Sequence, residues 1–243
     1  MTCKDTSMNK QLSAPATWAG LSDGLYLAKG RCPATIAKHL DQCLGKPAQV
    51  LDAGCGTGAI LAAWPREIDR TGFDRDPELV EHAAQRTQPR LRFVFGTFDE
   101  PPAGSFRAVL SLFGALQYVL DDEARQQAVL ALKSRVTRGG TMAIELGPDP
   151  DTMHPPVAIW TRWRTAEGQW WMRRSMGTLK DNILAIEFKF HRGGPASPVV
   201  HRDTHLIRPV RRDWWIAQFP PPLWTVQFDH IPGGGPLLIA SRA

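Results

Sequence analysis

One nine-residue stretch constrains the fold of this chain more than any other: Val50-Leu51-Asp52-Ala53-Gly54-Cys55-Gly56-Thr57-Gly58. An apolar run enters a turn with glycine at every second position, and an apolar segment typical of a helix follows. Glycine lacks a Cβ atom and tolerates positive φ, so such a turn lets the backbone approach a ligand closely. The free N–H groups at the start of the helix would suit a carboxylate or a phosphate. The stretch therefore predicts a strand, a ligand-binding loop and a helix.

The spacing of these glycines distinguishes the loop from two common phosphate-binding motifs. It is G-x-G-x-G, not the G-x-x-x-x-G-K-[ST] of a phosphate-binding loop or the G-x-G-x-x-G of a dinucleotide fold. The stretch from Val50 to Gly58 resembles motif I of the S-adenosylmethionine (SAM) dependent methyltransferases with a Rossmann-like fold. The resemblance implies SAM as the cofactor and S-adenosyl-L-homocysteine as its product. The alternative is a tight turn in some other α/β protein.

A second strand supports the same interpretation. In such a fold, an acidic residue about 20 residues after the glycines ends the next strand and accepts the ribose hydroxyls. The segment from Arg70 to Asp74 fits, with Asp74 at its end. Asp76 can cap the helix that Pro77 begins. The alternative for Asp74 is an ordinary capping or turn residue.

Hydrophobic patterns predict an α/β fold with a Rossmann-like, mostly parallel sheet and helices on both faces. The expected strands of the first part are Val50–Asp52, Thr71–Asp74, Leu91–Phe95, Phe106–Leu112 and Thr141–Leu146. The expected helices are one or two within Thr17–Leu44, then Ala59–Trp64, Pro77–Gln88 and Asp122–Val136. Gly139-Gly140 is expected to end the last of these helices.

The pattern changes after residue 155 to strands separated by turns, which predicts an antiparallel β cap inserted after the fifth strand. Its expected strands are Gln169–Met176, Ile183–Phe190 and Val199–Ile207. A helix near Arg212–Phe219 and two closing strands, Trp224–Phe228 and Leu237–Ser241, follow. The domain prediction is a flexible tail (1–16), a SAM-binding domain (17–154 and 210–243) and a substrate cap (155–209).

Tryptophan is concentrated in the second part of the chain. Seven of the nine tryptophans follow residue 150: Trp160, Trp163, Trp170, Trp171, Trp214, Trp215 and Trp224. A tryptophan ring offers a large rigid apolar surface with one hydrogen-bond donor, which suits a binding wall. We expect at least one of them to line an acceptor pocket, although a small sheet also needs bulky residues for its core.

Composition narrows the class of protein. The 243 residues are 43% hydrophobic, enough for a full core. No apolar stretch reaches the roughly 18 residues of a membrane-spanning helix, and the polar N-terminus has no signal core. The four cysteines have no C-x-x-C spacing, so we expect no metal site and no disulfide framework, and a reducing cytoplasm. The net charge of +5 is scattered, which does not favour nucleic-acid binding.

The resemblance is closest to bacterial methyltransferases of amino sugars and related natural products. It implies that Tyr26 donates to the SAM carboxylate, with added charge from Lys29 or Arg31. After the third strand the family often has Gly-Asp near the adenine, and this chain has Thr97 at the aspartate position. Thr97, Phe98 or Asp99 would supply that contact. The cofactor-binding candidates are Tyr26, Asp52, Gly54, Cys55, Gly56, Gly58, Asp74, Arg75, Thr97, Phe98 and Ser111.

Two further residues near the cofactor have other expected roles. Cys55 is interpreted as a small packing residue within the loop rather than as a nucleophile. Glu145, in the fifth strand, is expected to be buried or close to the methionyl part of SAM.

The catalytic candidates are Gln117, Tyr118, His154 and His205. The resemblance places a polar residue near the transferring methyl group after the fourth strand, where Gln117 and Tyr118 stand. Tyr118 could orient or deprotonate an acceptor, or pack the following helix. His201 and His205 are four apart and share one face of a strand. They could serve as a catalytic base, bind the acceptor as a pair, form a weak metal site or simply make a polar strand face. His154 lies in a proline-flanked loop and is a second candidate base.

The sequence therefore predicts a SAM-dependent methyltransferase that acts on a small acceptor, sugar-like or partly aromatic. N-methylation is favoured, with C- or O-methylation open. Pairing of two copies through the cap is also expected. Two alternatives remain: a methyltransferase of protein or tRNA, and a non-catalytic SAM-binding partner module.

Overall fold

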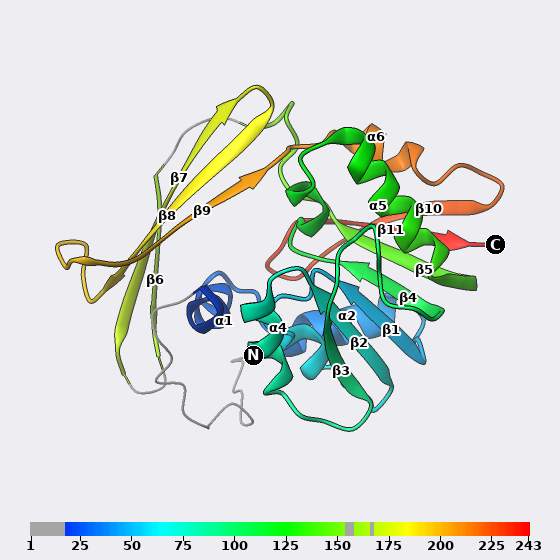
Figure 1. Ribbon diagram of the computed structural model, residues 1–243, viewed down its shortest axis with the longest axis horizontal. Coiled ribbons are helices and arrows are strands. Elements are labelled where there is room, and N and C mark those ends of the chain that lie inside the picture. The colour runs from blue at the N-terminus through cyan, green and yellow to red at the C-terminus, as the bar shows by residue number, and fades with distance from the viewer. Residues whose placement is uncertain (1–17, 154–157, 166–167) are drawn as a thin grey trace.

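The computed structural model describes residues 18–153, 158–165 and 168–243 (Figure 1). It contains a seven-stranded sheet with the order β10-β11-β5-β4-β1-β2-β3 and a four-stranded sheet with the order β6-β7-β8-β9. Figure 1 shows the two sheets standing apart, with α1 (Trp18–Ala28) between them. The predicted tail at 1–16 and the candidate base His154 lie outside the described residues.

The seven-stranded sheet is mostly parallel, as predicted. Strands β1 to β5 run parallel to one another, and β11 lies antiparallel between β5 and β10. The strands are β1 (Gln49–Ala53), β2 (Asp69–Asp74), β3 (Leu91–Phe95), β4 (Phe106–Ser111), β5 (Val136–Glu145), β10 (Trp224–His230) and β11 (Pro236–Arg242). The remaining helices are α2 (Pro33–Cys43), α3 (Ala59–Ala62), α4 (Pro77–Ala84), α5 (Asp122–Ser134), α6 (Arg212–Ala217) and the 3-10 turn η1 (Ala115–Tyr118).

The core lies on both faces of this sheet. In β1, Leu51 packs with α5 and α6, whereas its neighbour Val50 packs with α2 and α3. Successive side chains of a strand point to opposite faces, so a strand covered on both sides is mostly apolar on both faces. The apolar run before the glycines therefore follows from the position of β1 in the middle of the sheet.

One predicted boundary is wrong. Gly139 and Gly140 do not end a helix, because α5 ends at Ser134 and β5 already begins at Val136. The register between β4 and β5 shifts between Phe106 and Ala108, and Gly139 has a φ of +69° there. A strand irregularity and a helix C-terminus both use glycine at positive φ, so the local sequence does not distinguish them. The helices α3 and α4 are also shorter than predicted.

The second sheet is antiparallel, as the turn signals indicate. It consists of β6 (Ile159–Arg164), β7 (Trp170–Lys180), β8 (Ile183–Arg192) and β9 (Val199–Ile207), and we call it the cap. The strand β6 has no counterpart among the predicted strands. One face of the cap packs on α1 through Leu21, Leu25, Trp163, Trp171, Phe188 and Phe190.

Two further expectations concern the state of the cysteines and membrane-spanning helices. Cys43 and Cys55 are free thiols, whereas Cys32 is disulfide-bonded. The cysteine spacing, from which no disulfide framework is expected, did not indicate this bond. Among the described helices, none has the length and apolar content to span a membrane.

Candidate active site

The glycine loop between β1 and α3 has the conformation that its sequence predicts. Gly54, Gly56 and Gly58 have φ values of +75°, +54° and +71°. A Cβ on Gly54 would lie 2.9 Å from the Ala115 Cβ, and one on Gly58 would collide with the ring of Phe93. A Cβ on Gly56 would meet no atom within 4 Å. Gly54 and Gly58 are thus required by packing, and Gly56 faces the open space that a ligand can enter.

The N–H groups of this loop are used within the protein. Those of Gly54 and Cys55 donate to the Phe73 carbonyl, and that of Gly58 donates to the Cys55 carbonyl. The Gly56 N–H donates to Oδ2 of Asp74 at 2.9 Å. The expectation that the loop and helix present free donors to an anion is therefore not met at these positions. The loop suits a ligand that needs close backbone contact rather than a phosphate.

Asp74 lies at the carboxyl end of β2, directly beside the loop. Besides the Gly56 bond, its Oδ1 accepts from the Asp76 N–H at 3.0 Å. Burial raises the pKa of Asp74, and the two backbone donors oppose the shift. These two bonds fix the carboxylate and leave acceptor capacity on both oxygens, which suits a diol ligand.

Asp52 is a second carboxyl group under the loop. It is 2% exposed, and its Oδ1 has no hydrogen-bond partner among the described residues. Burial raises the pKa of Asp52 to about 7, and the charge of Asp74 adds to the shift. Asp52 is therefore protonated more readily than an exposed carboxyl group, because it is desolvated and close to a like charge.

Two side chains that the sequence did not indicate anchor the loop. The Thr57 hydroxyl donates to Oδ1 of Asp23 in α1 at 2.5 Å. Arg86, just after α4, donates from Nε to the Thr57 carbonyl at 2.7 Å and pairs with Asp23. The loop is thereby tied to the N-terminal helix. No local pattern marks Asp23 or Arg86, because both act through residues far away in the chain.

Glu145 at the end of β5 organises the opposite side of the site. It is 3% exposed and accepts two bonds from Arg31, at 2.7 and 2.5 Å. It also accepts from the N–H of Phe113 at 2.8 Å and of Gly235 at 2.9 Å. The expected burial of Glu145 is confirmed. Arg31, a candidate for charge toward a ligand, is instead neutralised by this carboxylate.

The Arg31 guanidinium also stacks 3.8 Å from the centroid of the Phe113 ring. Phe113 has a φ of +56°, an uncommon conformation for a bulky residue that costs roughly 1–3 kcal/mol. The bond from its N–H to Glu145 and the stack on Arg31 hold it there. The turn after β4 is thus positioned by a residue of β5.

Tyr26 lies against this turn, with its ring 4.7 Å from that of Phe113. Burial raises the pKa of Tyr26, while the charges of Arg31 and Arg173 oppose the shift. Arg173 comes from β7 of the cap, is 5% exposed and has an unpartnered Nε among the described residues. Burial lowers the pKa of both Arg173 and Lys29. An anionic group would be stabilised beside Tyr26, where these cations gather.

The remaining cofactor-binding candidates differ in how deeply they are buried. Phe98 contacts the loop from the end of β3, because its Cζ would lie 3.2 Å from a Cβ on Gly54. Thr97 is partly buried beside it, whereas Arg75 is exposed. Ser111 is fully buried at the end of β4, with an unpartnered Oγ among the described residues. Burial raises the pKa of Cys55 well above its usual value, so its thiol is a poor nucleophile.

Gln117 is placed in the scaffold rather than at an open surface. Its side chain is 1% exposed and donates from Nε2 to the Pro148 carbonyl at 3.1 Å. Its Oε1 occupies the space where a Cβ on Gly147 would stand. Gln117 therefore fastens η1 to the loop that follows β5.

Tyr118 and His205, two of the candidate catalytic residues, are brought together. The Tyr118 Oη lies 2.6 Å from His205 Nδ1, and His205 Nε2 lies 2.9 Å from Asp203 Oδ2. Trp18 and Phe188 enclose the imidazole, at ring distances of 4.7 and 4.8 Å. Burial raises the pKa of Tyr118 above its usual range. The group is a neutral phenol backed by an imidazole and a carboxylate, and it joins η1 to the cap.

The structure also places Asp203, His201 and several of the tryptophans. Asp203 was missed, although it stands two residues before His205 and so on the same strand face. His201 shares that face but lies outside the chain of bonds, near Phe190, with a ring distance of 5.5 Å. Trp215 and Trp224 lie in the core of the large sheet, and Trp163 and Trp171 pack on α1. The structure therefore accounts for these four tryptophans by packing.

Sequence comparison matches residues 50–140 to a family described as a methyltransferase domain. A dTDP-3-amino-3,4,6-trideoxy-alpha-D-glucopyranose N,N-dimethyltransferase of Streptomyces venezuelae is 25% identical over 78% of this chain and 82% of its own length. A ribosomal protein L11 methyltransferase of Burkholderia thailandensis is 34% identical over 51% of this chain. That match covers only 41% of the relative, so this chain spans less than half of it.

Solved structures of other proteins share the fold of this chain, including both sheets. DesVI of Streptomyces venezuelae has a TM-score of 0.83 at 24% identity, over 95% of this chain and 100% of that one. CalS10, an amino pentose methyltransferase from Micromonospora echinaspora solved with SAM bound, has a TM-score of 0.77 at 22% identity, over 96% and 99%. These similarities extend over both sheets.

Proposed function

Because residues 50–140 form a methyltransferase domain, we propose that this chain transfers a methyl group from SAM to the amino nitrogen of a small sugar-like acceptor. SAM is the methyl donor, and when bound it supplies a carbon already activated by the sulfonium. Similarity to amino-sugar N-methyltransferases over both sheets supports the nitrogen and the sugar. The scattered charge does not favour a protein or tRNA acceptor.

The described residues suit this cofactor. Gly56 leaves room for close contact, and Asp74 offers a fixed carboxylate for the ribose hydroxyls. Thr97 and Phe98 are proposed for the adenine, since both lie at the end of β3 beside the loop. The cations around Tyr26 suit the methionyl carboxylate. Buried Ser111 and Asp52 supply polar atoms below the loop.

The observation that carries the proposal is the bonded chain Tyr118–His205–Asp203 between η1 and the cap. We propose that the cap strands β6–β9 bind the acceptor, because the bonded group Tyr118–His205–Asp203 takes its residues from both η1 and the cap. An amine must lose a proton in the course of methylation, and a positioned base typically contributes 10²–10⁴-fold. Gln117 would position η1, and His154 remains a proposed second base.

A neutral Tyr118 can pass this proton without ionising. As the N–H proton moves to Tyr118 Oη, the phenol proton moves to His205 Nδ1, and the carboxylate of Asp203 stabilises the resulting imidazolium. This direction requires the neutral His205 to carry its proton on Nε2, facing Asp203 at 2.9 Å. The raised pKa of Tyr118 agrees with a phenol that relays a proton rather than storing a charge.

The test measures SAM turnover with a nucleotide-linked amino sugar for the wild type and three variants. The wild type should add one methyl group to the acceptor nitrogen and release equimolar S-adenosylhomocysteine. Tyr118→Phe and His205→Asn should each lower kcat about 100-fold, since each breaks the relay, with little change in the dissociation constant of SAM. Mass spectrometry of the product and calorimetric titration of the cofactor give both quantities.

His201→Asn is the matched control, because His201 lies on the same face of β9 outside the bonded chain. Its kcat should remain within about threefold of the wild type. An equal loss in all three variants would show that disturbance of the cap, not the relay, matters. Turnover with tRNA or a protein but not with amino sugars would overturn the proposed acceptor, and cofactor binding without any turnover would favour a SAM-binding partner module.

We also propose that two copies pair through the outer face of the cap. Large apolar side chains are exposed on the face of the cap that is turned away from α1: Trp160, Trp170, Val200 and Leu206. Exposed apolar patches of this kind commonly mark protein interfaces. Sedimentation should give twice the mass of one chain, and Trp160→Ser combined with Leu206→Ser should give monomers. Leu223→Ser, at an exposed leucine outside the cap, should leave the dimer intact.

A further inference from the structure

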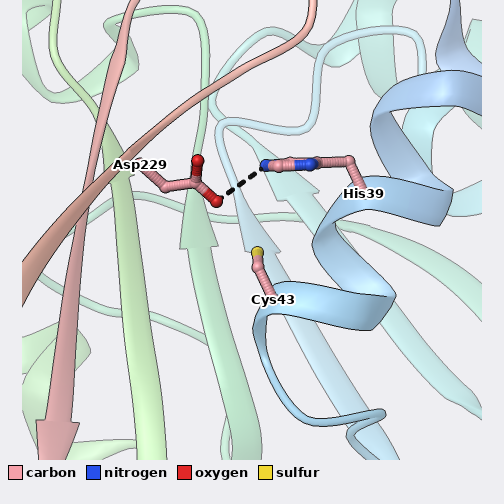
Figure 2. Close-up of side chains that lie close together, drawn as sticks. All are labelled: His39, Cys43 and Asp229. Atoms are coloured by element: carbon pink, nitrogen blue, oxygen red, sulfur yellow. Dashed lines mark ion pairs between the residues drawn. The ribbon is translucent and has the colours of Figure 1, made fainter.

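Three side chains of metal-ligating type converge on the face of the large sheet that α2 covers. Figure 2 shows His39 and Cys43 extending from α2 toward Asp229 of β10. One ligand atom from each residue, namely a histidine nitrogen, the cysteine sulfur and a carboxylate oxygen, lies within 4.8 Å of the other two. This cluster takes no part in the cofactor and acceptor contacts above.

Local geometry explains why these residues meet. His39 and Cys43 are four apart in α2, so both point to the same side of the helix. In β10, Val226 and Phe228 pack on the cluster that contains α5 and α6. Asp229 follows Phe228 and points to the opposite face, where α2 lies. Asp229 is far from both helix residues in sequence, so the cysteine spacing did not indicate this cluster.

The nitrogen of His39 and the sulfur of Cys43 make few contacts with other described groups. His39 Nε2 lies 3.0 Å from Asp229 Oδ2, yet it is not aligned for a hydrogen bond with any described group. The Cys43 thiol makes only a long contact of 3.7 Å with the Leu40 carbonyl in its own helix. A histidine–aspartate ion pair would account for two of the groups but not for a thiol directed at the same point.

We propose that His39, Cys43 and Asp229 bind one zinc ion. Imidazole nitrogen, thiolate sulfur and carboxylate oxygen are the ligand types that zinc takes, at about 2.0–2.3 Å in a tetrahedron. Such ligands lie about 3.3–3.7 Å from one another. Small side-chain rotations would bring the three atoms to that spacing. Asp229 and His39 are 38% and 27% exposed, so water can reach the site and serve as the fourth ligand.

Zinc at this position would clamp α2 to β10, an edge strand of the large sheet. Both elements lead to the cofactor side of the molecule. The turn after β10 contains Gly233, which packs so closely on the Gly30 carbonyl before α2 that a Cβ there would collide with it. A bound metal would therefore stabilise the folded state and hold these two turns together.

The test is titration of the chelator-treated, non-reduced full chain with Co²⁺ and with Zn²⁺. Co²⁺ should bind at one equivalent and produce a thiolate-to-metal absorption band, which excess Zn²⁺ abolishes. The band should be lost in Cys43→Ser, and His39→Gln and Asp229→Asn should each weaken binding about 10- to 100-fold. His230→Gln is the matched control, because His230 is the exposed neighbour of Asp229 in β10 and should leave the titration unchanged.

Cys55→Ser, at the other free thiol, should keep the absorption band. Zn²⁺ should also raise the melting temperature of the wild type but not that of His39→Gln, so the proposal can be tested even where Cys43→Ser folds poorly. Absence of binding with excess metal, or a band that survives Cys43→Ser, would overturn the proposal. Neither readout requires methyl transfer, so the result is independent of the proposed acceptor.

Discussion

Gly56→Val should weaken the binding of S-adenosylhomocysteine about 100-fold or more and leave the fold intact. Gly56 is the loop glycine whose added Cβ meets no protein atom, so a side chain there occupies the space proposed for the cofactor. A 100-fold loss corresponds to about 2.7 kcal/mol, which a steric clash with a bound ligand readily exceeds. Calorimetric titration of the variant and of the wild type measures the change.

The control must reproduce the backbone strain without the steric block. Gly45, after α2, also has a positive φ (+71°) and open space around an added Cβ. Gly45→Val should carry a similar backbone cost of roughly 1–2 kcal/mol. It should bind the cofactor product like the wild type. Normal binding by Gly56→Val would place the cofactor elsewhere and contradict the site.

Glu145→Ala should lower the free energy of unfolding by about 3–5 kcal/mol. Glu145 is the acidic partner of the largely buried Arg31, and it also accepts from the N–H groups of Phe113 and Gly235. Removing it leaves a cation and two backbone donors without their acceptor in a poorly hydrated place. Urea unfolding monitored by tryptophan fluorescence gives the change.

Two variants separate the charge from the general effect of truncation. Asp69→Ala removes one side of the exposed Asp69–Arg90 pair and should leave the unfolding midpoint nearly unchanged. Arg31→Met combined with Glu145→Leu should recover part of the loss, because no unpaired charge remains. A double variant as unstable as Glu145→Ala would show that the bonds from the backbone N–H groups of Phe113 and Gly235, not the ion pair, carry the effect.

The parts of the fold that depend on local patterns could be predicted. The glycine loop needs positive φ, and its two neighbouring strands need apolar residues on both faces. The position of Asp74 follows from the length of one helix and one strand. The antiparallel cap was predicted because turn residues separate strands with no helix between them.

Errors arose where one local signal serves two structures. The Gly139-Gly140 pair fits a helix end and a strand irregularity equally well, and the neighbouring strand decided between them. The N–H groups of Gly54, Cys55 and Gly56 are not free donors as expected, because Phe73 and Asp74 accept from them. Their positions depend on β2, which the loop sequence does not contain.

The sequence by itself determined a SAM-type loop, a parallel sheet around it and an inserted cap, because backbone conformation and hydrophobic period are properties of neighbouring residues. Only the tertiary structure decided how the functional side chains meet. It brought Tyr118 to His205, Arg31 to Glu145 and His39 to Asp229. The first two pairs are separated by 87 and 114 positions. Contacts over such distances depend on how sheets and helices pack on one another, and no local pattern encodes that packing.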